Sequence, residues 1–154
     1  MLHEPVDLEE LLQHCQEIFA MRIEEKGLCL RREIEAVPLV GGDIDHLEQV
    51  FNNLLDNAVK HTPEGGELGI MLRQPSAGFI EVVVADSGPG IPPEELPRVF
   101  ERFHQVDPNR AGAGLGLAIA REIVRAHGGD IEVRSVSGMG TEFIVSLPAK
   151  ETKS

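Results

Sequence analysis

The sequence has few of the features that mark several common protein classes. It contains only two cysteines, and its six histidines are scattered. There is no Cys-x-x-Cys pair and no spacing typical of a zinc site. No apolar run approaches the roughly 18 residues that a membrane-spanning helix needs, and the first residues do not resemble a signal peptide. We therefore expect reduced core cysteines, no zinc site and a cytoplasmic chain without direct membrane contact.

Basic residues are also scarce. The chain has 14 lysines and arginines against 26 acidic residues, which gives a formal net charge of -12. Such a field repels nucleic acid and anionic lipid, and the chain contains no basic tract for either. These features argue against a nucleic-acid partner, and an anionic ligand would need locally placed hydrogen-bond donors.

The chain is long enough, at 154 residues, to bury one core. It contains no internal repeat and no long linker, so we assign residues 7–149 to one domain. Residues 1–6 are assigned to a leader or interdomain linker remnant, and residues 150–154 to a polar tail. Apolar periodicity predicts helices over 7–27, 45–62 and 112–127 and strands over 28–34, 37–40, 68–72, 79–85, 130–136 and 141–147.

This order of elements predicts an α/β fold. We expect a two-layer α/β sandwich, in which a mixed sheet of about five or more strands carries about three main helices on one face. Asp7 and Asp45 are the predicted N-caps of the first two helices, each with a glutamate at the capping-box offset. The nearly continuous apolar run at 79–85 indicates a central strand, linked to the preceding strand as a hairpin.

The stretch 47–62 is the predicted central helix. Its apolar residues recur at helical spacing, at Leu47, Val50, Phe51, Leu54, Leu55, Ala58 and Val59. Asn53, Asn57 and Lys60 fall on one edge beside that stripe. Amide oxygens suit a hard cation and an ammonium group suits an anion, a combination that fits a metal-bound phosphate. From the helix alone, an ordinary solvated polar edge is the simpler interpretation.

Asp86 stands at the end of a predicted buried strand and is followed by Gly88 and Gly90. An ionised carboxylate only accepts hydrogen bonds, so Asp86 would favour the amino group of adenine over the carbonyl of guanine. The glycines leave the backbone bare enough for a flat ring to approach. By itself, the same segment is equally typical of a turn.

Gly112, Gly114 and Gly116 open the third predicted helix. Free N–H groups and the positive end of the helix dipole suit a phosphate there, although a glycine hinge without a ligand has the same pattern. No Gly-Lys-Ser/Thr follows, which excludes a Walker A loop, and the spacing differs from the dinucleotide fingerprint. The segment 138–141 has the pattern of a hairpin turn that also shapes the pocket.

In this order the segments resemble the N, G1, F, G2 and G3 boxes of the bacterial sensor histidine kinases. The matching segments are 53–62 (NLLDNAVKHT), 86–91 (DSGPGI), 100–103 (FERF), 112–117 (GAGLGL) and 138–141 (GMGT). The resemblance covers nearly the whole chain. It implies the Bergerat fold with a flexible ATP lid at 104–111, and ATP and Mg²⁺ as ligands.

The resemblance also implies roles for individual residues. Asn57 would hold the metal with Asn53 assisting, Lys60 would face the phosphates, and Asp86 would bind the adenine amino group beside His61. The implied catalytic residues are Asn53, Lys60 and Arg110. The remaining implied ATP-binding residues are Gly88, Gly90, Ile91, Phe103, Gly112, Gly114, Leu115, Gly116, Leu117 and Thr141.

By the same resemblance, the reaction is transfer of the γ-phosphoryl group of Mg-ATP to a histidine on a separate dimerisation domain. A response regulator receiver domain would then take the phosphoryl group on an aspartate. His3-Glu4-Pro5 lacks the acceptor's sequence context, so we expect the acceptor elsewhere, in a parent protein anchored in the inner membrane. The isolated domain is expected to be monomeric and nearly inert.

Two departures from the family pattern bear on activity. Asn53 stands where the hydrolysing relatives of this fold carry a glutamate, and an amide cannot take a proton from water. The lid is short, with Gln105 where an arginine is frequent, which leaves Arg110 and Arg102 as candidates for a γ-phosphate contact. Two alternatives stay open: a nucleotide-binding regulatory module without phosphotransfer, and a Bergerat-fold ATPase, which Asn53 disfavours.

Overall fold

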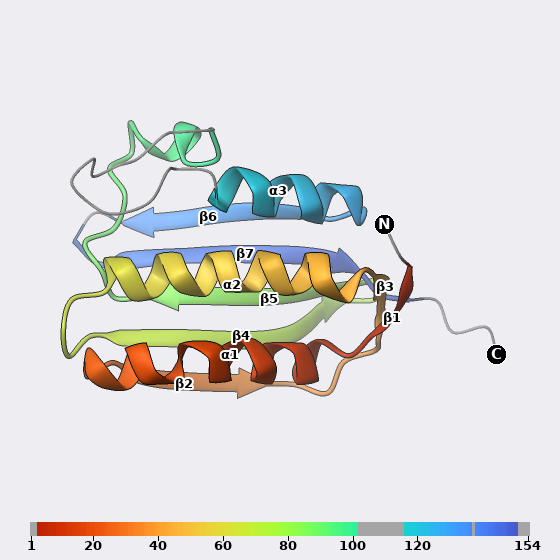
Figure 1. Ribbon diagram of the computed structural model, residues 1–154. Coiled ribbons are helices and arrows are strands. Elements are labelled where there is room, and N and C mark those ends of the chain that lie inside the picture. Colours follow the sequence, from red (N-terminus) through yellow and green to blue (C-terminus); the bar gives the residue numbers. More distant parts are fainter. Residues whose placement is uncertain (1–2, 102–115, 137, 151–154) are drawn as a thin grey trace.

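The computed structural model describes residues 3–101, 116–136 and 138–150. These residues form a five-stranded sheet, a separate two-stranded sheet and helices packed on one side (Figure 1). In chain order the elements are β1 (Glu4–Val6), α1 (Leu8–Glu25), β2 (Cys29–Ile34), β3 (Val40–Gly42), α2 (Ile44–His61), β4 (Glu67–Ser76), β5 (Phe79–Asp86), the 3-10 turn η1 (Leu96–Arg98), α3 (Gly116–Ala126), β6 (Asp130–Val136) and β7 (Gly140–Pro148).

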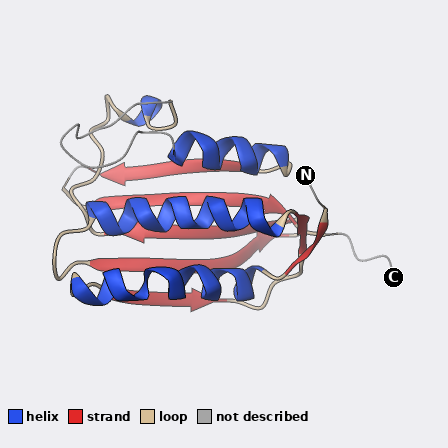
Figure 2. Cartoon of the chain, in the orientation of Figure 1, coloured by secondary structure: helices blue, strands red, loops and turns tan. Residues whose placement is uncertain are grey.

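The large sheet has the strand order β2-β4-β5-β7-β6. β2 runs parallel to β4, and every other neighbouring pair is antiparallel, so the sheet is mixed. β5 occupies the centre, and β4 and β5 form the expected hairpin. Figure 2 shows α1, α2 and α3 side by side on one face of this sheet. The predicted two-layer α/β sandwich is confirmed.

The core lies between the helices and the sheet. The whole predicted stripe of α2 is buried, and Phe51 and Leu54 are completely inaccessible. They pack with alternate residues of the central strands, such as Val82 and Val145, in one continuous cluster. Because α2 lies across the middle of the sheet, its polar edge is held in a fixed position beside the strand ends.

The first two helices each begin after an aspartate N-cap, and one of the two predicted caps was correct. Asp7 caps α1 as predicted, and its carboxylate accepts the N–H groups of Glu9 and Glu10. The N-cap of α2 is Asp43, whereas Asp45 was predicted. Asp43 accepts the N–H of Asp45 at 3.0 Å, which places Asp45 inside the first turn. The prediction was wrong because two aspartates two residues apart offer competing caps.

The second strand prediction was also wrong. A strand was expected over 37–40, but β3 spans Val40–Gly42 and pairs antiparallel with β1. Residues 4–6, assigned from the sequence to a leader or linker remnant, form β1, and Val6 is buried in the core. Pairing between segments this far apart leaves no local sequence signal, and the domain boundaries stay a prediction.

The two cysteines differ in environment. Cys15 is buried, and burial, together with the charge of Glu48, raises the pKa of its thiol to about 12. Cys29 is exposed on the edge strand β2, so the expectation that both cysteines belong to the core was wrong for Cys29. Within the described residues, no helix is long and apolar enough to cross a membrane.

The topology gathers several chain segments at one end of the molecule. The C-terminal end of α2, the N-terminal end of α3, the end of β5 and the turn between β6 and β7 all lie at this end, on the left of Figure 1. β1 and β3 lie at the opposite end. Segments that are far apart in the sequence therefore contribute to one location.

Candidate functional site

The polar edge of α2 forms one side of this location. Asn53, Asn57, Lys60 and His61 are all half-buried, beside the buried stripe of the same helix. The side-chain amide of Asn57 makes no hydrogen bond within the part of the chain that the structure describes. Its oxygen is therefore available to a ligand, and an amide oxygen is an acceptable ligand for a hard cation. The predicted arrangement on the helix is present.

Asn53 connects α2 to the start of α3. Its Nδ2 donates a hydrogen bond of 3.0 Å to the backbone oxygen of Gly116. A carbonyl can only accept, so this contact fixes which end of the amide points to α3 and leaves Oδ1 for another partner. This bond holds the first residue of α3 against the predicted N-box segment of α2. A ligand site formed by both segments requires such a contact.

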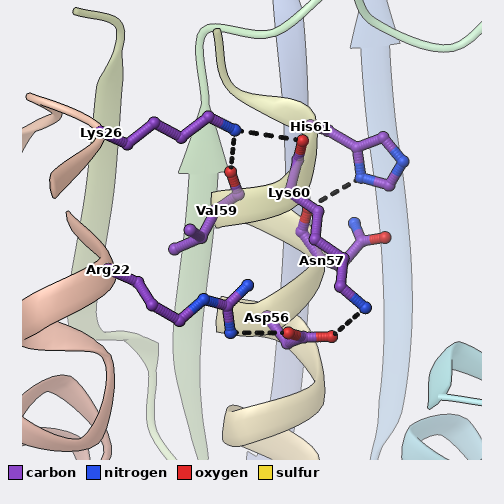
Figure 3. Close-up of polar contacts among 7 residues, drawn as sticks. All are labelled: Arg22, Lys26, Asp56, Asn57, Val59, Lys60 and His61. Carbon is purple, nitrogen blue, oxygen red and sulfur yellow. Dashed lines mark hydrogen bonds and ion pairs between the residues drawn. The ribbon is translucent and has the colours of Figure 1, made fainter. Parts of the chain in front are cut away.

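His61 is held against its own helix. Its Nδ1 donates to the backbone oxygen of Asn57 at 2.7 Å, as Figure 3 shows. This bond fixes the plane of the imidazole ring at the last turn of α2 and leaves Nε2 for another partner. The ring also lies close enough to Asp86 for its charge to favour the ionised carboxylate. His61 and Asp86, predicted to share the purine site, are thus brought together.

Lys60 is engaged by a neighbour on the same helix. Its Nζ lies 2.9 Å from Oδ2 of Asp56, while Arg22 of α1 lies 2.8 Å from Oδ1 of the same carboxylate (Figure 3). Burial alone would raise the pKa of Asp56, but the hydrogen bonds from Lys60 and Arg22 outweigh it and hold the pKa below its usual value. Contact between Lys60 and a phosphate would therefore involve an exchange of partners.

A second basic residue of α1 supports the end of α2. Lys26 Nζ donates to the backbone oxygens of Val59 and Lys60, at 2.6 and 3.2 Å (Figure 3). The last carbonyls of a helix lack partners within it and carry partial negative charge, so a lysine there satisfies both needs. Arg22 and Lys26 together fix the turn of α2 that carries Lys60, the residue predicted to contact the phosphates.

Asp86 is the last residue of β5 and lies beside the end of α2. Its Oδ1 accepts the N–H of Gly88 at 2.9 Å, which leaves Oδ2 for a ligand. Burial raises the pKa of Asp86, and the bond from Gly88 and the charge of His61 oppose this. A Cβ at Gly88 would lie 2.5 Å from the backbone oxygen of His61. Only glycine lets this turn approach the end of α2.

The turn after Asp86 is fastened to the hairpin between β6 and β7. The N–H of Gly138 donates to the backbone oxygen of Pro89 at 2.5 Å. Thr141 lies directly opposite Asp86 in the β5–β7 register and is almost completely buried. The two segments predicted as G1 and G3 boxes thus form one continuous surface.

Gly90 and Gly140 both have positive φ angles, 77° and 120°. A side chain at Gly90 would collide with the backbone oxygen of Val136, and one at Gly140 with the backbone oxygen of Asp86. Glycine is therefore required at both positions by backbone conformation and by space. This explains the two glycines without any reference to a ligand.

The predicted F box begins at Phe100, which packs into the sheet. Its ring meets that of Phe143 edge-to-face, with centroids 6.1 Å apart. The guanidinium of Arg121, on α3, lies 5.1 Å from the centroid of the Phe100 ring. Phe100 therefore links α3 to β7 beside the site.

Other predicted residues lie partly or wholly outside the described residues. Gly116 and Leu117 form the first turn of α3, with Leu117 half-buried. The predicted lid 104–111 lies outside the described residues, as do Phe103, Arg110, Gly112, Gly114 and Leu115. The roles assigned to these residues stay predictions.

A family model supplies the decisive comparison. Residues 42–151 match the family described as histidine kinase-, DNA gyrase B-, and HSP90-like ATPase. This chain belongs to that family. The matched span begins just before α2 and includes α2, the turn after Asp86, α3 and the hairpin between β6 and β7, but not α1, which supplies Arg22 and Lys26.

Individual relatives place the chain more narrowly. The signal transduction histidine-protein kinase/phosphatase MprB of Mycolicibacterium paratuberculosis is 40% identical over 157 residues, which cover 97% of this chain and 29% of that protein. A solved structure of the mycobacterial sensor histidine kinase MprB shares 36% identity and a TM-score of 0.86, covering 98% of this chain and 100% of that one. Full-length ShkA in complex with AMPPNP shares 35% identity and a TM-score of 0.88, over 99% and 33% of the two chains.

These findings confirm the predicted family, fold class and role as the ATP-binding catalytic domain of a histidine kinase. The enzyme class of the relatives, protein-histidine kinase, is the predicted one. The chain spans less than a third of the length of the MprB relative. The complete kinase reaction and its protein partners are therefore matters for proposal.

The sequence analysis missed several residues of this kinase domain, among them Asp56, Arg22, Lys26 and Ser135. Asp56 lies four residues before Lys60, a spacing that by itself predicts an ion pair on a helix. Arg22 and Ser135 had no such signal, because their contacts with Asp56 and with Ile91 join segments far apart in the sequence. Only the packing of α1 on α2 and of β6 beside the Asp86 turn brings them into the site.

Proposed function

We propose that this domain binds ATP with Mg²⁺ and transfers the γ-phosphoryl group to a histidine supplied by a separate dimerisation domain. The observation that supports this most directly is the bond from Asn53 to Gly116, which joins the amide-bearing edge of α2 to the helix start expected at the phosphates. The reaction forms a phosphorus–nitrogen bond at the acceptor histidine and releases ADP.

The donor set fits the proposed ligands. The amide oxygen of Asn57, which has no hydrogen-bond partner among the described residues, and the Oδ1 of Asn53 suit Mg²⁺, which prefers oxygen ligands and keeps several waters. Asp86 offers an acceptor to the adenine amino group, and Gly88 lets the turn that carries this carboxylate approach the end of α2. Lys60, and Arg110 from the lid, are the proposed phosphate contacts. Phosphoryl transfer requires mainly positioning and charge neutralisation, which this set provides.

The proposed partners follow from the same role. The acceptor domain belongs to the parent kinase, and a receiver domain of a response regulator takes the phosphoryl group from it. We propose that the isolated domain is a monomer and that it acts in the cytoplasm, where ATP is available. A stable dimer at micromolar concentration in light scattering would contradict the first of these statements.

Calorimetric titration tests the nucleotide site. ATP and GTP, each with and without Mg²⁺, are titrated into the wild type and Asn57→Ala. We expect Mg²⁺-dependent binding of ATP in preference to GTP, weakened at least about tenfold by the loss of one metal ligand. Gln49→Ala is the matched control, since it removes an exposed amide from an earlier turn of the same helix. Wild-type protein that binds neither nucleotide would refute the proposal.

Phosphotransfer is tested separately. The domain is mixed with the dimerisation domain of its parent kinase and labelled Mg-ATP, and acid-labile, alkali-stable phosphate is measured. The proposal predicts label on the acceptor domain. ATP binding without any label would favour the regulatory module, for which the short lid and Gln105 are the supporting features.

A further inference from the structure

Ser135, near the end of β6, makes three contacts through one hydroxyl group. Its Oγ accepts the N–H of Ile91 at 2.6 Å and donates to the backbone oxygen of Gly140 at 2.9 Å. It also lies 3.0 Å from Oγ1 of Thr141. One side chain therefore fastens the turn after Asp86 to the hairpin between β6 and β7.

The three contacts determine where the hydroxyl hydrogens point. A serine hydroxyl has one hydrogen and two lone pairs. The hydrogen goes to Gly140, because a carbonyl oxygen can only accept, and one lone pair takes the N–H of Ile91. Only a lone pair is left for Thr141. Thr141 must therefore donate its own hydrogen to Ser135.

This direction changes what Thr141 offers to a ligand. With its hydrogen committed to Ser135, the Thr141 oxygen presents only lone pairs to any further partner. Ser135 lies opposite Thr141 in the β6–β7 register, and Thr141 lies opposite Asp86 in the β5–β7 register. The three side chains therefore share one row on one face of the sheet. Oδ1 of Asp86 is occupied by Gly88, so the row presents Thr141 Oγ1 and Asp86 Oδ2 as neighbouring acceptors.

We propose that Ser135 is a positioning residue for base selection, which makes Thr141 an acceptor beside Asp86 and so favours a purine with a 6-amino group over one with a 6-oxo group. The inference rests on the proposed function, because it assumes that a purine nucleotide occupies this site. A 6-amino group donates hydrogens to both acceptors. A 6-oxo group carries only lone pairs, so it would face two acceptor oxygens with no hydrogen available to form a bond with either.

The test compares ATP with inosine triphosphate. The base of inosine triphosphate carries a 6-oxo group in place of the 6-amino group and a proton on the ring nitrogen N1, and is otherwise the same. Dissociation constants for both Mg²⁺ complexes are measured by calorimetry for the wild type and Ser135→Ala. Loss of Ser135 frees the Thr141 hydrogen to donate to the 6-oxo group. We expect the ratio of the two constants to fall by about tenfold, the effect of roughly one hydrogen bond.

Two further variants separate positioning from stability. Ser135→Thr keeps the hydroxyl on a strand that tolerates β-branched residues, and should retain the wild-type ratio. In a Thr141→Val background, Ser135→Ala should leave the ratio unchanged, because the effect acts through Thr141. Ser146→Ala, at the far end of β7, is the control and should change neither constant. If Ser135→Ala does not fold, Ser135→Cys provides the same comparison with a weakly bonding thiol.

The outcomes are distinguishable. Equal weakening of both nucleotides in Ser135→Ala, with an unchanged ratio, would show that Ser135 only stabilises the turn and would overturn the inference. Wild-type preference for ATP together with that result would leave the proposed function intact. Wild-type protein that binds neither nucleotide would overturn both.

Discussion

Asn53 Nδ2 donates to the backbone oxygen of Gly116 across 3.0 Å, and this bond joins the central helix to the first turn of α3. The two residues are far apart in the sequence and belong to different predicted boxes. The bond consumes the donor end of the amide, so Asn53 is committed to positioning and offers only its oxygen to a ligand. A residue in this state has no means of removing a proton from water.

Slow ATP hydrolysis follows from this arrangement. We expect the isolated domain, with Mg-ATP and no acceptor domain, to hydrolyse ATP at a rate close to the uncatalysed background in a coupled assay. Turnover comparable to that of a dedicated ATPase would contradict the kinase assignment. Heat-treated protein at the same concentration controls for contaminating activity.

Asn53→Ala should affect nucleotide binding through α3. Without the bond to Gly116, the start of α3 loses its tie to α2. We expect a stability loss of about 1–2 kcal/mol in urea unfolding and weaker binding of ATP. Gln49→Ala, on the exposed side of α2, should change neither property. Unchanged ATP affinity in Asn53→Ala would show that the bond does not support the site.

Asp86→Asn tests the base-binding carboxylate. The amide introduces a donor beside the position proposed for the adenine amino group and removes a charge-assisted acceptor. We expect ATP affinity to fall by about ten- to a hundredfold, measured by calorimetry. Glu81→Gln on the same strand is the matched control, because residues an odd number apart on a strand face opposite sides of the sheet. Equal effects of the two variants would refute a specific role for Asp86.

Asp56 should make stability depend on pH. Its pKa is lowered in the folded protein, so it stabilises the fold at pH values above the unfolded-state pKa of about 3.8. That contribution is lost as the pH falls through the lower, folded-state value. We therefore expect Asp56→Asn to be less stable than the wild type at neutral pH, with the difference shrinking progressively below about pH 4.

The measurement is urea unfolding of both proteins from pH 7 to pH 3. Glu24→Gln controls for a general change of charge, because Glu24 is exposed on α1 and its side chain makes no ion pair with a described residue. If the stability difference between Asp56→Asn and the wild type is constant over this range, the contacts with Arg22 and Lys60 do not make stability depend on pH.

Gly140→Ala should be more damaging than an equivalent change in a surface turn. Gly78 has a φ of 91° and open space around its Cα, so Gly78→Ala should cost about 1–2 kcal/mol from backbone strain alone. Gly140 has a φ of 120°, and its added Cβ would also collide with the backbone oxygen of Asp86. We expect a larger loss of stability for Gly140→Ala, together with weakened ATP binding. Similar effects of the two changes would contradict a close approach at Gly140.

Local patterns in the sequence predicted much of this fold because they depend on near neighbours. The apolar stripe of α2 follows from the helical period, and the buried run of β5 predicted a central strand. The order of the glycine-rich segments and the amide edge also carried the resemblance that predicted the family. These features require no knowledge of which distant segments touch.

The interactions that complete the site were decided by tertiary structure. Helical spacing presents Lys60, but only the packing of α1 brings Arg22 to Asp56 and holds that lysine in place. Strand patterns predicted β6 and β7, but only their register sets Ser135 opposite Thr141, and Thr141 opposite Asp86. Hydrogen bonds and ion pairs act over about 3 Å, so they form only after the hydrophobic core has brought distant segments together. The local pattern thus determined which chemical groups are present, and burial of the shared core determined which of them meet.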